Sequence, residues 1–123
     1  MPSISKKTLV LGASANPARY SFLAINKLRE YHHPVVAIGR NVSVVGDITI
    51  QNAVAPIEDL DTVTIYLNGN NQKNYFDYII EQNPHRVIFN PGAENPPFEK
   101  ILKEKGIQVL EACTLVLLGT GQY

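Results

Sequence analysis

The sequence predicts a doubly wound α/β fold, in which a parallel sheet of about five strands lies between two layers of helices as a three-layer α/β/α sandwich. Two observations lead to this class. Short apolar runs lack polar alternation, which is typical of strands buried on both faces. Segments with helical periodicity separate these runs, as in repeated βαβ units. The length of 123 residues suits one domain, which we expect to span residues 1–123.

Five short runs rich in Val, Leu, Ile and Thr are the candidate strands. They cover residues 8–11, 35–38, 62–67, 86–89 and 107–110. Numbered along the chain, the strands are expected in the order 3-2-1-4-5, which is typical of doubly wound sheets.

Three helices are predicted between these strands. The first covers residues 19–31, where Phe22, Ile25 and Leu28 recur every three residues. Pro34 ends this helix.

Cap residues mark the ends of the other two helices. Asn70 or Asn71 is the expected N-cap of the second helix, and Pro84 ends it. The third helix is expected to begin at the N-cap Asn95, followed by a proline at the first helical position. Gly106 then supplies its left-handed end.

Two segments fit this alternation less well. Residues 41–60 form a long connection without a helical pattern, in which residues 42–50 alternate weakly around Gly46 and are compatible with a small hairpin. Residues 114–123 fit either a short helix or a strand, and the pattern does not decide between them.

Composition and charge argue against several classes of protein. Eleven basic residues balance eleven acidic ones, so the net charge is zero and a nucleic-acid partner is not expected. The longest apolar stretch, residues 115–118, is far below the roughly 20 residues that span a membrane. The single cysteine, Cys113, excludes an intrachain disulfide and a cysteine zinc site. With a polar N-terminus in place of a signal peptide, we expect a cytoplasmic protein.

Loops rich in Asn, Gly and Pro follow the predicted strands. They are residues 12–21, 39–41, 68–71 and 90–95. Such residues also make ordinary turns. Because the carboxyl ends of parallel strands meet at one edge, where doubly wound sheets bind ligands, we expect these loops to form a ligand cleft.

The first of these loops has the setting of a phosphate-binding loop, because it follows a strand and begins a helix. It does not match G-x-G-x-x-G, since Gly12, Ser14 and Pro17 occupy the three glycine positions. Free amides at the helix N-terminus can still hold a phosphate. Ser21 adds a hydroxyl donor and Arg19 a cation that can pair with phosphate oxygens.

The residue after the second strand points to the kind of nucleotide. A NAD site has Asp or Glu there, whereas this chain has Arg40. An arginine at this point favours a ribose that carries an extra phosphate, as NADP and coenzyme A do. The alternative is that Arg40 is an ordinary surface residue.

Together these motifs resemble the stand-alone CoA-binding domain family, which is similar to the Rossmann-like N-terminal domain of the succinyl-CoA synthetase α subunit. The resemblance covers essentially the whole chain. It is carried by residues 10–14, 16–17, 19–21, 37–40, 87–92 and 106–113.

The resemblance implies a role for each loop. Residues 12–17 would hold the CoA diphosphate, and Arg40 would lie near the adenosine phosphate. Residues 66–68 would line the adenine and pantetheine path, and residues 90–92 would lie on the far side of the cleft. The cofactor contacts expected on these grounds are Gly12, Ala13, Ser14, Ala15, Asn16, Pro17, Arg19, Ser21, Gly39, Arg40, Tyr66, Leu67, Asn68, Asn90, Pro91 and Gly92.

Candidate catalytic residues are few. His32 and His33 end the first helix, and His85 precedes the fourth strand. All three therefore lie at the edge of the sheet opposite the predicted ligand cleft. His32 and His33 are expected in solvent. Cys113 follows the fifth strand on the ligand edge, and a buried, inert thiol is its commoner role. In the sequence, Glu111 has no second carboxylate as a partner, so it gives little support for acid–base chemistry.

We therefore expect a protein that binds CoA or an acyl-CoA without chemistry of its own and without a metal. The alternatives are a small NADP-linked oxidoreductase, and a partner-binding domain with a vestigial nucleotide cleft. A homo-oligomer or a protein partner stays open.

Overall fold

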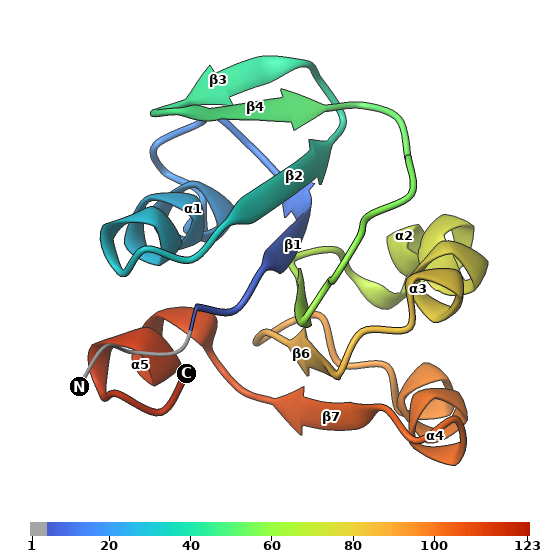
Figure 1. Cartoon of the computed structure of the whole chain (residues 1–123). Coiled ribbons are helices and arrows are strands. Elements are labelled where there is room, and N and C mark those ends of the chain that lie inside the picture. The colour runs from blue at the N-terminus through green and yellow to red at the C-terminus, as the bar shows by residue number, and fades with distance from the viewer. Residues whose placement is uncertain (1–4) are drawn as a thin grey trace.

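The computed structural model describes residues 5–123, and within this range seven strands form one sheet (Figure 1). The strands are β1 (Thr8–Ala13), β2 (Val35–Gly39), β3 (Ser43–Val45), β4 (Ile48–Gln51), β5 (Thr62–Ile65), β6 (Arg86–Phe89) and β7 (Gln108–Glu111). The helices are α1 (Tyr20–Glu30), α2 (Gly69–Gln72), the 3-10 turn η1 (Lys73–Tyr75), α3 (Phe76–Gln82), α4 (Pro96–Glu104) and α5 (Thr114–Gly119).

The order of the strands is β3-β4-β2-β1-β5-β6-β7. All neighbours pair in parallel except β3, which pairs antiparallel with β4 at the edge. The predicted doubly wound, Rossmann-like α/β class is thus confirmed, with two more strands than expected.

The predicted order of the strands was wrong. The third apolar run, now β5, lies beside β1 rather than beyond β2. The place beyond β2 is taken by β4, the second strand of the hairpin compatible with residues 42–50. The strand β4 is short and its alternation is weak, so its sequence indicates a parallel strand less clearly than the apolar run of residues 62–67 does.

Two apolar cores cover the two faces of the sheet. On one face, Ile25 and Leu28 of α1 and Leu118 of α5 pack against Val10 and Ala37 of the strands. On the other face, α3 and α4 pack against β5 and β6, with Phe98 lying 6.1 Å from Phe89 between ring centroids. Figure 1 shows α1 and α5 together on one side of the sheet and α2, α3 and α4 on the other.

The ends of the helices follow the predicted signals with one correction. Asn95 caps α4 by accepting a hydrogen bond from the Phe98 N–H, and Gly106 adopts a φ of +80° beyond its end. The N-cap of α2 is Asn68 instead of Asn70 or Asn71, because β5 ends at Ile65 and the helix begins earlier.

The C-terminal segment, which the sequence left open, forms the helix α5. In the part of the chain that the structure describes, no helix has both the length and the apolar character needed to cross a bilayer.

The expectation that both histidines at the end of α1 lie in solvent was wrong for His33, whose side chain is only 6% exposed. Its Nδ1 accepts a hydrogen bond of 2.9 Å from the Lys6 N–H, and its ring lies 4.9 Å from that of Tyr123. His32 lies in the turn after α1, where its backbone has a φ of 67°, and its side chain is exposed. The histidine nearer the strand is therefore a buried link between α1 and the start of β1.

Candidate functional site

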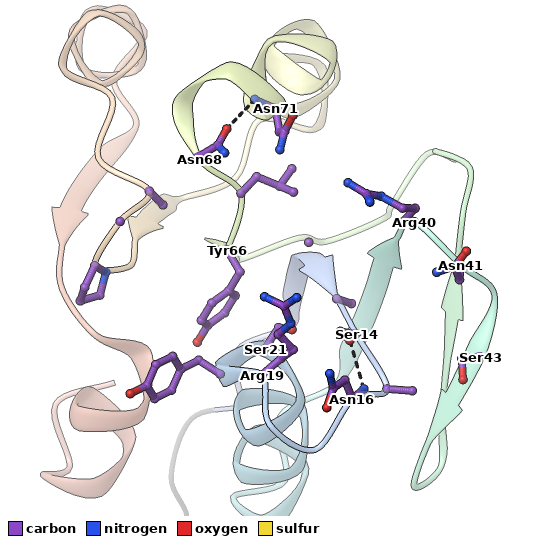
Figure 2. A pocket seen from close by; sticks show the side chains of 18 of the residues that line it. Ser14, Asn16, Arg19, Ser21, Arg40, Asn41, Ser43, Tyr66, Asn68 and Asn71 are labelled. Carbon is purple, nitrogen blue, oxygen red and sulfur yellow. Dashed lines mark hydrogen bonds between the residues drawn. The ribbon is translucent and has the colours of Figure 1, made fainter.

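A pocket of about 770 Å³ opens at the carboxyl edge of the sheet, where the connections from β1 and β5 depart to opposite faces (Figure 2). Four connections build it, those that follow β1, β2, β5 and β6. Its lining residues are Gly12, Ala13, Ser14, Ala15, Asn16, Arg19, Tyr20, Ser21, Arg40, Asn41, Val42, Ser43, Tyr66, Leu67, Asn68, Asn71, Pro91, Gly92 and Ala93.

The loop after β1 is shaped by its own polar side chains. Ser14 Oγ accepts a hydrogen bond of 3.0 Å from the Asn16 N–H, and Asn16 Oδ1 accepts one of 3.0 Å from the Ala18 N–H. Gly12 turns the chain with a φ of +88°, and a side chain there would meet Leu67 at 3.1 Å. Ser14 and Asn16 thus stabilise the turns of the loop that lines the pocket.

The N-terminus of α1 faces the pocket through Tyr20 and Ser21. Its N-cap, Arg19, has an extended backbone and makes no side-chain hydrogen bond to the helix, and no acidic residue stands in the first turn. The amides of this first turn therefore keep their donor capacity toward the pocket, together with the positive end of the helix dipole. This is the local arrangement that holds phosphate groups.

The charged side chains of the pocket are all basic. Arg19 and Arg40 line it, and none of its described lining residues is acidic. In a chain with zero net charge, this concentrates positive potential at one place. Figure 2 shows Arg40 extending from the end of β2 across the space between the hairpin and α2. The arrangement suits a ligand with anionic groups at two separated positions.

Residues 66–68, which follow β5, form another part of the pocket wall. Tyr66 packs against the α1 side of the core, and burial raises the pKa of its hydroxyl to about 12, so the group is neutral at physiological pH. Asn68 uses its side-chain oxygen to accept a hydrogen bond of 3.0 Å from the Asn71 N–H. Its oxygen is therefore occupied in the fold, while its amide group remains available toward the pocket.

A buried glutamine fixes the distance between two pocket walls. Gln72 is fully buried, and its Nε2 donates to the carbonyl oxygens of Leu67 at 2.8 Å and Ala93 at 2.6 Å. Its Oε1 accepts a hydrogen bond of 3.0 Å from Asn95 Nδ2. Leu67 and Ala93 both line the pocket, so this side chain joins the connection after β5 to the connection after β6.

Most of the cofactor contacts expected from the sequence lie in the pocket wall, but Pro17, Gly39 and Asn90 do not. Pro17 is exposed in the loop. Gly39 is buried where β1 and β2 approach closely, because a Cβ there would lie 2.1 Å from the Ala13 carbonyl oxygen.

Asn90 is a structural residue at the end of β6. Its Nδ2 donates to Thr64 Oγ1 at 2.7 Å and to the Ile65 carbonyl at 3.0 Å. Its Oδ1 accepts a hydrogen bond of 2.9 Å from the Thr114 N–H. The side chain therefore joins β5, β6 and the start of α5 beneath the pocket.

Several lining residues were not among the expected contacts. They are Tyr20, Asn41, Val42, Ser43, Asn71 and Ala93. Residues 41–43 lie at the entrance to the hairpin directly after β2, so they stand at the ligand edge once the hairpin is recognised. The sequence feature that could have indicated these residues is the weak alternation around Gly46, which marks the hairpin.

The candidate catalytic groups stand apart from the pocket wall. Cys113 is half-buried at the N-cap of α5 and is not a lining residue. Glu111 lies beside Glu99, whose hydrogen bond and negative charge raise the pKa of Glu111. Among the residues that the structure describes, no group of His, Cys, Asp and Glu side chains is arranged to hold a metal ion.

The fold and the pocket define a doubly wound α/β protein with a cleft at its switch point whose charged lining residues are basic. The sequence model of the CoA binding domain family matches residues 6–119, and the chain belongs to this family. Among curated proteins, the comparison found no match.

Solved structures share the whole fold. The crystal structure of an uncharacterised protein is 44% identical and superposes with a TM-score of 0.95, over 98% of this chain and 100% of that chain. A protein from Thermus thermophilus is 21% identical with a TM-score of 0.83, over 97% and 91% of the two chains. A hypothetical protein from Pyrococcus horikoshii OT3 is 21% identical with a TM-score of 0.81, over 91% and 80%. The last two are similar in fold alone.

Proposed function

We propose that this chain binds coenzyme A, free or as an acyl-CoA, in the pocket at the carboxyl edge and performs no chemistry on it alone. The observation that carries the proposal is the pair of guanidinium groups in a pocket without a carboxylate, at the uncapped start of α1. Membership of the CoA binding domain family supports CoA as the class of ligand.

In this proposal, the diphosphate lies at the loop after β1. The first-turn amides of α1 and the guanidinium of Arg19 would donate to its oxygens. Arg40 would pair with the phosphate on the ribose of the adenosine. Leu67 and Asn68 would flank the ligand between these two positions, and Pro91 and Gly92 would close the far side of the pocket.

We propose that the protein alone catalyses no reaction on the bound CoA because of the side chains that line the pocket. Hydroxyl, amide and guanidinium groups dominate the wall, and the half-buried thiol of Cys113 lies outside it. Such groups bind and orient a ligand, but they include no nucleophile paired with a general base.

The test compares ligands that differ by one group. Thermal unfolding and calorimetry would be measured with CoA, acetyl-CoA, dephospho-CoA, NADP and NAD. A ligand at 100 times its Kd should add about 2.7 kcal/mol to the free energy of unfolding. CoA should stabilise the protein more than dephospho-CoA. Stabilisation by NADP alone would instead favour an oxidoreductase, and no stabilisation by any of them would contradict nucleotide binding.

Arg40→Ala tests the assignment of the terminal phosphate. The loss of a hydrogen-bonded charge pair should weaken CoA binding by about 1.5–3 kcal/mol and leave dephospho-CoA binding nearly unchanged. Lys100→Ala removes an exposed cation of α4 outside the pocket and serves as the control. Equal losses for the two ligands would contradict the role of Arg40.

A further inference from the structure

The hairpin that forms one wall of the pocket is joined to the sheet by a short backbone ladder. β3 pairs only with β4, and β4 pairs with β2 through two residue pairs. Val45 and Ile50 point into the core, whereas Val42 and Val44 are exposed. A sheet edge joined by so few backbone pairs is expected to open locally more readily than the centre of the sheet. A further constraint would therefore change how well the wall is positioned.

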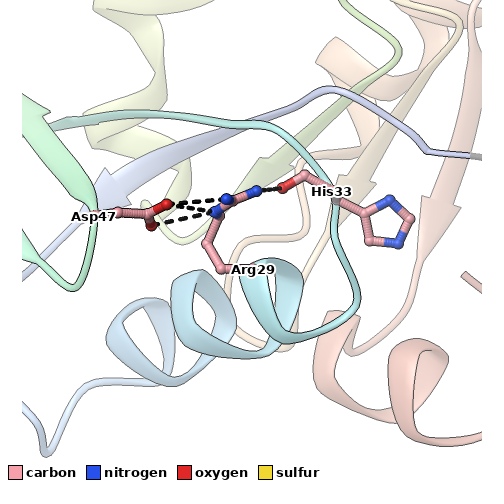
Figure 3. Close-up of polar contacts among 3 residues, drawn as sticks. All are labelled: Arg29, His33 and Asp47. Atoms are coloured by element: carbon pink, nitrogen blue, oxygen red, sulfur yellow. Dashed lines mark hydrogen bonds and ion pairs between the residues drawn. The ribbon is translucent and has the colours of Figure 1, made fainter.

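That constraint is present at the tip of the hairpin (Figure 3). Arg29, in the last turn of α1, donates from Nη2 to Asp47 Oδ2 at 2.9 Å and from Nε to Asp47 Oδ1 at 3.2 Å. This two-point contact is the only ion pair within residues 5–123. The hydrogen bond from Arg29 also holds the pKa of the Asp47 carboxyl below its ordinary value, so the pair is charged at neutral pH.

The guanidinium is also held from its other side. Nη1 of Arg29 donates to the His33 carbonyl oxygen at 2.9 Å, in the segment between α1 and β2. The Arg29 side chain is therefore fixed by the end of its own helix while it holds the hairpin tip. A preoriented arginine loses less side-chain entropy on pairing than a free one.

The tether connects two walls of the same pocket. α1 lines the pocket at its N-terminal end, through Tyr20 and Ser21, and carries Arg29 at its other end. The hairpin lines the pocket at its start, through residues 41–43, and carries Asp47 at its tip. The two elements are thus joined at the ends that lie away from the pocket, so the ion pair restricts how the hairpin can tilt relative to α1.

We propose that Arg29 and Asp47 are positioning residues of the pocket, which set the separation between the α1 wall and the hairpin wall without touching the ligand. This inference rests on the proposed function, in which CoA places its diphosphate on α1 and its adenosine phosphate beside the hairpin. A ligand that spans both walls depends on their separation, whereas a ligand that contacts only the α1 wall does not.

The experiment measures Kd for CoA and for 4′-phosphopantetheine in the wild type and in Asp47→Ala. CoA should bind about two- to fivefold more weakly in the variant, the range for an exposed ion pair. The Kd of 4′-phosphopantetheine should stay unchanged. Glu30→Ala, which removes an exposed acidic residue next to Arg29, is the matched control and should bind both ligands as the wild type does.

A double-mutant cycle separates the ion pair from its single residues. In an Arg29→Ala background, Asp47→Ala should cause no further loss of CoA affinity. In the wild-type background, Asp47→Glu keeps the carboxylate and should retain most of the wild-type CoA affinity. Unchanged CoA affinity in Asp47→Ala, or an equal loss for both ligands, would overturn the positioning role.

Hydrogen exchange keeps this outcome distinct from failure of the proposed function. If the wild type does not bind CoA, the proposed function is contradicted, and exchange in the free protein then tests the tether itself. Faster exchange of the residue 43–51 amides in Asp47→Ala, with β6 unchanged, supports the tether. Unchanged exchange in the hairpin overturns it.

Discussion

At the scale of the residue, two neighbouring chain segments come too close at Gly39 for any side chain. The glycine ends β2 opposite Ala13 of β1, and the register between these strands shifts just before Ala13. This irregularity brings the Ala13 carbonyl oxygen to 2.1 Å from where a Cβ on Gly39 would lie. The requirement for glycine is thus a requirement of packing beneath the pocket, and not of contact with a ligand.

Gly39→Ala should therefore destabilise the protein by about 1–3 kcal/mol or more, because the strand ends must separate to admit the methyl group. Urea unfolding measures this loss. Gly119→Ala is the matched control, since no atom lies within 4 Å of the added Cβ and its φ is not positive. That change should stay within about 1 kcal/mol of the wild type or stabilise the end of α5. A Gly39→Ala protein as stable as the control would contradict the close approach.

At the scale of the element, the connection from α1 into β2 depends on a neutral histidine. Nδ1 of His33 accepts the Lys6 N–H, so it carries no proton in the folded state. Burial lowers the pKa of His33, and the neighbouring positive charges of Lys6 and Arg86 lower it further, with Asp61 opposing them. The unfolded chain therefore binds a proton at His33 at a pH where the folded chain does not.

This difference predicts a loss of stability in mild acid. The contribution of His33 is fully present above the ordinary histidine pKa of about 6.5, and it is lost as the pH falls from there toward the lowered pKa of the folded state. The free energy of unfolding, measured from about pH 8 to pH 5, should decline less steeply in His33→Gln than in the wild type. His85→Gln, at an exposed position, should keep the wild-type slope. A wild-type slope in His33→Gln would contradict the assignment.

Elements with strong local signals could be predicted from the sequence. The cap at Asn95 and the left-handed Gly106 both lie where the pattern indicated, because their causes are local hydrogen bonds and backbone angles. The hairpin was only one option for residues 42–50, because two strands of three and four residues offer little periodicity. The choice between helix and strand at residues 114–119 depends on packing against α1, which no local pattern contains.

The candidate site, too, could be predicted from the sequence only in part. Its loops could be predicted, because parallel strands bring their carboxyl ends to one edge. The role of Asn90 could not, since its partner Thr114 lies 24 residues away and the contact exists only after the sheet and α5 have assembled. An asparagine after a strand looks the same in the sequence whether it binds a ligand or joins two elements.

At the scale of the whole molecule, stability is expected to fall from the centre of the sheet toward the edge that carries the hairpin. All residues of β5 and β6 are buried, and each of these strands has a parallel neighbour on both sides. The pocket lies between this stable centre and the weaker hairpin edge. A binding site built in this way has one fixed wall and one wall that a ligand can order.

Native-state hydrogen exchange measures this gradient directly. The slowest amides should lie in β1, β5 and β6, with exchange close to that of global unfolding, and β3 and β4 should exchange through smaller local openings. Saturating CoA should slow exchange in residues 40–43 more than in β6, because ligand binding orders the wall that opens most readily. Equal protection of β3 and β5 in the free protein would contradict the gradient. Slowing spread evenly over the sheet would show that the ligand acts on global stability and not on the hairpin wall.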